Sequence, residues 1–287
     1  MPISLKRAST FVEGLDHPEC IAFHPDGSLW AGGEAGQIYR ISPDGKTIDT
    51  VAGTGGFILG LAFAPGAEWL VACDLRKQCL WRLDVKTAQL TEFARGVPGH
   101  PLSIPNHLAF AADGALYVTD SGHFRQADGA ILRFDADGSG RGGVWHPGPF
   151  NFANGIALHP RDAALYVACT WLPGVERIAI QPDGSPGKRT VFARLPKSLP
   201  DGLAFDARGN LFVSCYTPAR IYRITPDRNV TVFIEDWEAH TLCNPTNIAF
   251  GGADRRNLFA ANLGRWHITR IDARTLGAPL ASMATNE

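Results

Sequence analysis

The five-residue phrase Asp201-Gly-Leu-Ala-Phe205 has five close relatives elsewhere in the chain. The first residues of successive phrases are separated by 40, 47, 48, 47 and 45 positions. Such even spacing indicates an internal repeat that is long enough for four short strands, as in the blades of a β-propeller. The other five phrases are Glu19-Cys-Ile-Ala-Phe23, Leu59-Gly-Leu-Ala-Phe63, Asn106-His-Leu-Ala-Phe110, Asn154-Gly-Ile-Ala-Leu158 and Thr246-Asn-Ile-Ala-Phe250.

Each repeat carries short runs in which apolar and polar residues alternate, the pattern of strands rather than helices. Asp-Gly pairs such as Asp26-Gly27 separate the runs and suit tight hairpins, since glycine readily adopts positive φ. We therefore predict an all-β fold, a six-bladed β-propeller with four antiparallel strands per blade, formed by residues 1–287 as one domain. In the first repeat the predicted strands are residues 21–23, 28–31, 37–41 and 48–51.

The two ends of the chain are predicted to close the ring. The N-terminal run Ser9–Gly14 resembles Thr190–Arg194 and Thr231–Glu235, which precede other copies of the phrase. It is therefore expected to supply the outermost strand of the last blade, which would leave no sheet edge open. Leu280–Met283 is an alternative segment for the same role.

Composition excludes several classes of protein. The 287 residues are 45% apolar, and 27 basic side chains balance 28 acidic ones, so neither disorder nor a nucleic-acid partner is expected. No run of about 18 apolar residues and no secretory leader is present, which predicts a cytoplasmic protein without a membrane partner. The six cysteines lack zinc spacing and are expected to be buried thiols. A monomer or small homo-oligomer is expected.

The first residues of the six phrases are expected to surround one mouth of the central tunnel, because each marks the start of an innermost strand. Four of them carry oxygen atoms of the kind that hard divalent cations bind. Asn154-Gly155 and Asp201-Gly202 could instead be ordinary turn formers. That alternative does not account for a glutamate in the same register. The four residues are Glu19, Asn106, Asn154 and Asp201.

Phe152–Leu158, Leu199–Val213 and Ile104–Asn106 resemble the senescence marker protein (regucalcin)/gluconolactonase family, and the resemblance spans the whole chain. It implies a six-bladed propeller similar to paraoxonases and diisopropylfluorophosphatase. It also implies one divalent metal held by a Glu, an Asn and an Asp, here Glu19, Asn154 and Asp201. Asn106 would lie close to the substrate or complete the metal shell. Ca²⁺ is favoured, with Mg²⁺, Mn²⁺, Zn²⁺ and Fe²⁺ as alternatives.

The family's characteristic reaction implies a metal-dependent lactonase that opens the lactone of a sugar acid. Asp201 is the predicted general base, by analogy with the family. Ile104 and His107 stand where members with the regucalcin substrate pocket carry Arg and Asp. Substrate-binding residues are predicted on the same face, although the aromatic ones could simply pack the tunnel mouth; they are Asn106, His107, Asp120, His123, Trp171, Tyr216, Trp266 and His267, and Asp74 and Asn262 join the rim.

Two alternative functions remain open from the sequence. The same metal site could hydrolyse organophosphates or aryl esters, or the propeller could bind a metabolite, Ca²⁺ or a protein without turnover. No Gly-x-Ser-x-Gly or Walker A motif is present. His17 falls in a turn and receives no role in this interpretation.

Overall fold

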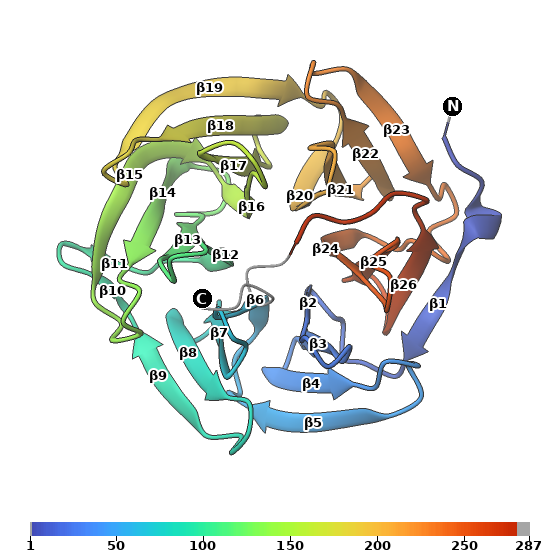
Figure 1. Cartoon of the computed structure of the whole chain (residues 1–287), viewed down its shortest axis with the longest axis horizontal. Coiled ribbons are helices and arrows are strands. Elements are labelled where there is room, and N and C mark those ends of the chain that lie inside the picture. The colour runs from blue at the N-terminus through green and yellow to red at the C-terminus, as the bar shows by residue number, and fades with distance from the viewer. Residues whose placement is uncertain (1, 280–287) are drawn as a thin grey trace.

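The computed structural model describes residues 2–279 and shows six four-stranded antiparallel sheets arranged as blades around a central axis (Figure 1). The all-β, six-bladed propeller predicted from the repeat is confirmed. The four strands of the first repeat also form near their predicted positions, as β2 (Cys20–Phe23), β3 (Leu29–Gly32), β4 (Gln37–Ile41) and β5 (Ile48–Gly53).

We number the blades in chain order, so that β2 to β5 form blade 1, with the innermost strand named first. Blade 2 comprises β6 (Ile58–Phe63), β7 (Trp69–Asp74), β8 (Cys79–Asp84) and β9 (Leu90–Ala94), and blade 3 comprises β12 (Pro105–Phe110), β13 (Leu116–Asp120), β14 (Ala127–Phe134) and β15 (Gly142–Asn151). Blade 4 comprises β16 (Ala153–Leu158), β17 (Ala164–Cys169), β18 (Gly174–Ile180) and β19 (Pro186–Arg194), and blade 5 comprises β20 (Leu199–Phe205), β21 (Leu211–Thr217), β22 (Arg220–Ile224) and β23 (Val230–Glu235). Blade 6 comprises β24 (Pro245–Gly251), β25 (Asn257–Asn262), β26 (His267–Asp272) and β1 (Ala8–Glu13).

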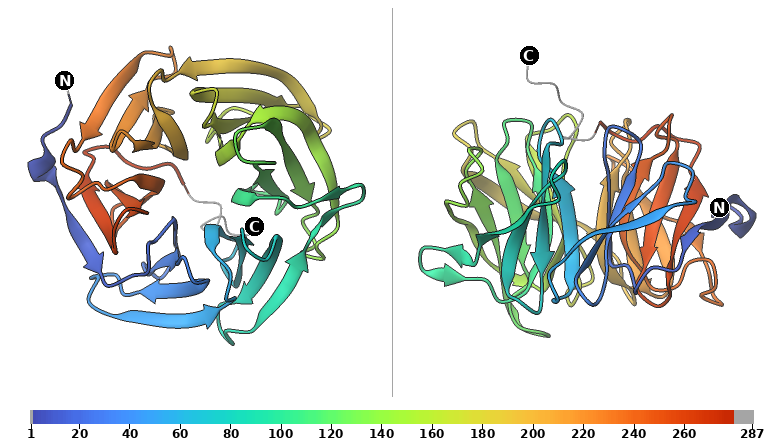
Figure 2. Two further views of the ribbon diagram at one scale, coloured as in Figure 1. Left: turned by 180° about the vertical axis from the view of Figure 1, so that it is seen from behind. Right: turned by 90° about the horizontal axis from the view of Figure 1, so that it is seen from below.

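The N-terminal strand closes the ring as predicted. β1 pairs antiparallel with β26, with Ala8 opposite Ile271 and Glu13 opposite His267. Figures 1 and 2 show this first strand on the outer edge of the last blade. The alternative segment Leu280–Met283 lies outside the described residues.

The innermost strand of each blade is the repeated phrase, and its alternation explains its composition. In blade 5, Leu203 and Phe205 pack into the core shared with blade 4, while Ala204 packs against the core shared with blade 6. Successive residues of a strand point to opposite sides, so each inner strand packs its large residues against one neighbouring blade and a small alanine against the other. The six alanines of this position are Ala22, Ala62, Ala109, Ala157, Ala204 and Ala249.

The hydrophobic core consists of six clusters, each between two neighbouring blades. Between blades 3 and 4, for example, Trp145 and Phe150 of β15 pack with Ile156 of β16. Each sheet therefore buries both faces against its neighbours, which fixes the inner strands relative to one another.

The remaining elements are short. A 3₁₀ helix, η1 (Leu5–Arg7), precedes β1, and the hairpin of β10 (Gly96–Val97) and β11 (His100–Pro101) precedes blade 3 (Figure 1). No helix within residues 2–279 has the length and apolarity needed to cross a membrane. All six cysteines are buried and free.

Candidate functional site

Four of the phrase-opening residues occupy equivalent places where the inner strands begin. Asn106, Asn154 and Asp201 lie at the starts of β12, β16 and β20 and are buried, and Glu19 directly precedes β2. Neighbouring inner strands contact one another around the ring. The fold therefore gathers these side chains at one end of the tunnel.

Glycine follows Asn154 and Asp201 because two inner strands approach each other closely at these points. Gly155 and Gly202 lie inside strands, and neither has a positive φ. A Cβ added at Gly155 would collide with the carbonyl oxygen of Asp201, and one at Gly202 would lie 2.6 Å from the carbonyl oxygen of Thr246. The alternative interpretation of these pairs as turn formers is therefore wrong.

Glu19 and Asp201, which we call the acid pair, bring two carboxyl groups into a buried environment. Asn154 Nδ2 donates to Asp201 Oδ2 at 3.1 Å, whereas Glu19 Oε2 is buried with no hydrogen-bond partner within residues 2–279. Burial raises the pKa of both carboxyl groups, and the nearby charge of Asp201 raises the pKa of Glu19 further. A hard divalent cation would offset both charges and use the orphaned oxygen as a ligand, so these residues fit such a metal.

Two hydroxyl groups determine how the asparagine side chains face. Ser121 Oγ donates to the carbonyl oxygen of the residue before Asn154 at 2.6 Å, and Thr170 Oγ1 donates to that of the residue before Asp201 at 2.8 Å. Since each hydroxyl proton is committed, each hydroxyl accepts from an amide: Asn106 Nδ2 at 3.1 Å and Asn154 Nδ2 at 3.3 Å. Both amide oxygens are thereby left for a ligand in the tunnel.

Sequence reasoning missed this hydroxyl relay, which we define as Ser121 and Thr170. Each follows directly the last residue of the second strand of its blade, and Tyr216 holds the corresponding place in blade 5. Hydroxyl residues at one register of consecutive repeats were the available signal. The relay links each asparagine to the backbone beside the next site residue.

Removing the relay is expected to weaken cation binding without unfolding the propeller. Thr170→Val frees the amide of Asn154 to rotate, so we expect about a tenfold loss of Ca²⁺ affinity in calorimetric titration, as for other groups that orient ligands. Thr170→Ser retains the hydroxyl and should bind like wild type. Thr231→Val, on β23, is the control for loss of a threonine hydroxyl elsewhere. Unchanged affinity in Thr170→Val would contradict the orienting role.

His107 and Asn247 close the tunnel across its axis. They follow the site position in β12 and β24, which lie on opposite sides of the ring (Figure 1), and their side chains are hydrogen-bonded. Burial lowers the pKa of His107 to about 4, so the ring is neutral at pH 7. Its Nδ1 accepts from Ile156 N at 3.4 Å, and its Nε2 is hydrogen-bonded to the side-chain amide of Asn247.

A cavity of about 410 Å³ lies at the other end of the tunnel. Phe23, Phe205 and Phe250 are among its mainly apolar lining residues, and His107 and Asn247 line it as well. His107 was expected to line the end of the tunnel that holds the candidate metal ligands. It lines the cavity at the opposite end. The tunnel has a polar end with the two carboxyl groups and an apolar end.

Three other predicted substrate-binding residues are engaged in local structure. Asp120 is buried and accepts from Ile104 N at 2.7 Å and from His100 at 2.9 Å. His267 is buried, and its Nε2 bonds the carbonyl oxygen of Thr241 at 3.0 Å. The His123 ring is bonded to Asp128 at 2.6 Å and stabilises its own loop. These contacts indicate structural roles. Asp74 and Asn262 are likewise buried and hydrogen-bonded to backbone groups.

The predicted aromatic residues have more open positions. Burial and the charges of Asp201 and Glu19 raise the pKa of the Tyr216 hydroxyl. Trp266 is 53% exposed, and Trp171 packs edge-on against Phe124, which is 61% exposed. Sequence reasoning missed Phe124.

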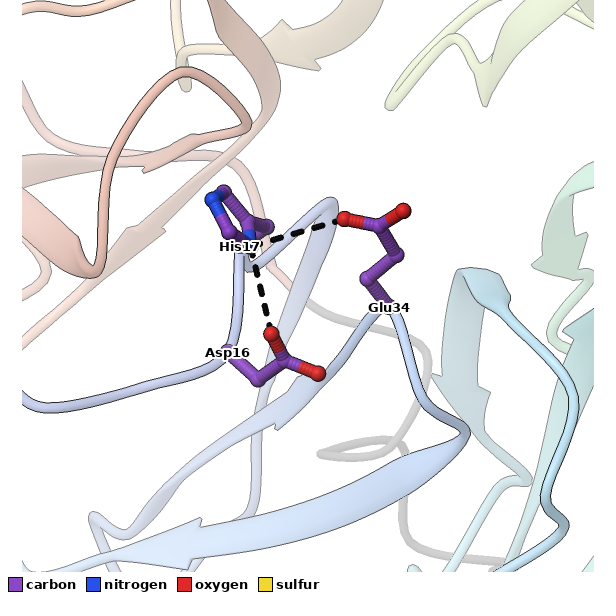
Figure 3. Close-up of side chains that lie close together, drawn as sticks. All are labelled: Asp16, His17 and Glu34. Carbon is purple, nitrogen blue, oxygen red and sulfur yellow. Dashed lines mark hydrogen bonds and ion pairs between the residues drawn. The ribbon is translucent and has the colours of Figure 1, made fainter.

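His17 lies beside Trp266, with the two ring centroids 5.6 Å apart. Its ring stands between the carboxylates of Asp16 and Glu34 (Figure 3). One ligand atom from each lies within 4.8 Å of the others, a grouping that could hold a metal ion. Its acids already have partners, since Asp16 Oδ2 accepts from Ala35 N at 3.0 Å and Glu34 pairs with Arg76 at 3.3 Å. This mouth cluster, Asp16, His17 and Glu34, was not predicted.

Comparison with known proteins places the chain in a family. The family model described as SMP-30/Gluconolactonase/LRE-like region matches residues 18–262, which include all four phrase-opening site residues. The chain belongs to this family. The SMP-30/gluconolactonase resemblance seen in the sequence is thereby confirmed.

Several members of the SMP-30/gluconolactonase group are similar to the chain. A gluconolactonase of Zymomonas mobilis is 26% identical over 241 residues, covering 76% of this chain and 64% of its own length. A 6-deoxy-6-sulfogluconolactonase of Pseudomonas putida is 34% identical over 134 residues, covering 46% and 44%. The chain thus spans less than two thirds of either relative. The solved structure of a Xanthomonas campestris gluconolactonase has a TM-score of 0.79 at 23% identity, covering 92% of this chain and 89% of its own, which shows the shared fold.

Proposed function

We propose that the protein hydrolyses the lactone of a sugar acid with one divalent cation. Glu19, Asn154 and Asp201 would hold the cation, and Asn106 would lie beside the substrate or complete the shell. The observation that carries the proposal is the buried, unpartnered Glu19 oxygen in the same environment as Asp201. The names of the two curated relatives, a gluconolactonase and a sulfogluconolactonase, support the class of reaction.

The site formed by Glu19, Asn106, Asn154 and Asp201, which we call the deep site, is a better candidate for the cation than the mouth cluster. In the mouth cluster, backbone and cationic groups already satisfy Asp16 and Glu34. In the deep site, a carboxylate oxygen and two amide oxygens are left without protein partners by the bonding described above. An all-oxygen set of two carboxylates and two amides favours Ca²⁺.

Different residues of the chain would have different roles in opening the ester. When bound, the cation would polarise the lactone carbonyl and offset the charge that develops on its oxygen. Asp201 accepts from Asn154 through Oδ2, and within the described residues its Oδ1 has no hydrogen bond, so Oδ1 is placed to take a proton from an attacking water. Glu19 and Asn154 would act only as ligands that hold the cation. Tyr216 holds the register of Ser121 and Thr170 in blade 5, from which it would contact the substrate ring.

The proposal is tested by metal analysis together with turnover. We expect about one divalent cation per chain by elemental mass spectrometry, and acid release from glucono-1,5-lactone that stops with chelator and returns with Ca²⁺ or another divalent cation. A phosphotriester and an aryl ester serve as competing substrates. Turnover of those esters with lactones inert would replace the proposed substrate class. A protein that stays inert after every cation is restored would leave a binding propeller.

A further inference from the structure

Arg125 is a cation at the tunnel mouth whose guanidinium group pairs with no acidic side chain of residues 2–279. It lies in the exposed loop between β13 and β14. The guanidinium lies over the rings of Phe124 at 5.5 Å and Trp171 at 5.4 Å, measured to the ring centroids. Stacking of this kind supports the planar group while its N–H donors stay available at the edges.

The loop that carries Arg125 is held in place. The His123 backbone N–H donates to Asp128 Oδ1 at 2.9 Å, and Ser103 Oγ donates to the Gly122 carbonyl oxygen at 3.2 Å. Gly122 has φ 74°, and a Cβ there would collide with the Asp128 carboxylate, so glycine is required at this turn. These contacts fix the direction in which the loop presents its side chains.

The aromatic support comes from two blades and adjoins the proposed metal site. Phe124 of blade 3 packs edge-on against Trp171 of blade 4 at 5.3 Å and against Phe152, in the connection between the two blades, at 5.9 Å. Phe152 is two residues before Asn154. We define Phe124, Phe152 and Trp171 as the aromatic platform. The indole nitrogen of Trp171 is buried without an acceptor in the described part of the chain, so the platform also has an unused donor.

The Arg125 loop begins at Ser121 of blade 3, and Tyr216 holds the same register in blade 5. Burial and the charges of Asp201 and Glu19 raise the pKa of the Tyr216 phenol, while Arg125 acts in the opposite direction. Arg76, another cation of this face, is paired with Glu34 at 3.3 Å.

We propose that Arg125 and the aromatic platform select lactones that carry an anionic substituent, a carboxylate or sulfonate at the end of the chain away from the ester. The guanidinium would bind the oxyanion through two donors, and the platform would pack against the carbon skeleton. This inference rests on the proposed function, because it assigns the substrate class of that same site.

Two matched lactones test the selection. D-Glucono-1,4-lactone is neutral, and D-glucaro-1,4-lactone has the same ring with a terminal carboxylate. In Arg125→Ala we expect KM for the anionic lactone to rise about tenfold or more, the range of a lost charge-assisted contact, with kcat little changed. Turnover of the neutral lactone should change by less than twofold. Arg125→Lys should recover part of the loss, because lysine keeps the charge but not the fork.

A matched control is Arg228→Ala. Arg228 is also exposed, has φ 66° and lies over an aromatic ring, that of Phe192 at 5.6 Å, but it belongs to the β22–β23 turn. It should leave both lactones unaffected. Raised salt should lower wild-type kcat/KM for the anionic lactone and have little effect in Arg125→Ala. Equal losses on both lactones, or none on the anionic one, would overturn the inference.

A binding measurement distinguishes failure of this inference from failure of the proposed function. If wild type hydrolyses neither lactone, calorimetric titration with D-glucarate still tests the oxyanion contact. Binding that Arg125→Ala weakens about tenfold would keep Arg125 as an anion-binding residue of a non-hydrolytic site. Equal or absent binding in both proteins would overturn it.

Discussion

The Asp201→Asn variant is expected to lose lactone turnover by about a thousandfold or more while the propeller remains folded. Asp201 is the residue to which we assign both a metal ligand and the proton acceptor, and removing a general base alone costs about a hundred- to ten-thousandfold. An Asn side chain keeps the shape and can still accept from Asn154 through its oxygen. The measurement is kcat by pH-stat, with Ca²⁺ affinity by calorimetry and folding by circular dichroism.

Asp206→Asn is the matched control for this variant. Asp206 belongs to the same inner region of blade 5 and is also buried, but its carboxylate accepts from Asn210 N at 2.8 Å and from Thr275 at 2.9 Å. We expect that variant to lower the melting temperature and to preserve kcat. Asp201→Asn with turnover within tenfold of wild type would show that another group accepts the proton.

The second large effect concerns the metal-free protein, which should become less stable as pH rises. Burial raises the pKa of Glu19 and Asp201, and repulsion from Asp201 adds to the shift of Glu19. A carboxyl group with a raised pKa in the folded state favours folding while it is protonated. That contribution is present at low pH and is lost as pH rises from the ordinary value of about 4 through the raised folded value.

Thermal unfolding in chelator at pH 5 and pH 8 measures this effect. Each proton released at a pKa raised by one unit removes about 1.4 kcal/mol, or about 3 to 6 °C for a domain of 150 to 250 residues. Glu19→Gln removes the charge, so its metal-free melting temperature should fall less between the two pH values than that of wild type. Ca²⁺ should stabilise wild type more at pH 8 than at pH 5. Parallel pH profiles for wild type and Glu19→Gln would contradict the buried acid pair.

The fold was predictable from sequence because its determinant is periodic. Each blade repeats one inner-strand phrase, so alternation within a single copy, such as Leu203 and Phe205 toward blade 4 and Ala204 toward blade 6, is repeated around the ring. The positions of Glu19 and Asp201 followed from the same register. A property shared by six copies is visible in a linear sequence.

The parts that were not predicted depend on contacts between blades. Gly155 was open to a turn interpretation because the carbonyl oxygen that excludes a side chain belongs to Asp201 in the next blade. Thr170 acts through the backbone of blade 5, and Arg125 depends on Trp171 of blade 4. Such contacts have no period within the chain.

Side-chain direction was a second obstacle. Asp120 stands at the end of a strand beside the predicted site, yet its oxygens turn toward the Ser103 and Ile104 backbone rather than remaining free. The same sequence position would suit a substrate ligand if the preceding loop followed another path. Local sequence does not distinguish these two cases, because the loop conformation decides which donors reach the carboxylate.

The hydrogen bond between His107 and Asn247 limits how molecules can enter and leave the tunnel. It spans the axis, so a molecule that reaches the acid pair from the polar end cannot continue through the ring. In the proposed reaction, the ring-opened acid would therefore leave by the opening through which the lactone arrived, and the two would compete for one path. A polymeric ester could not be threaded through the protein, and only a compact molecule or an exposed chain end could be presented to the site.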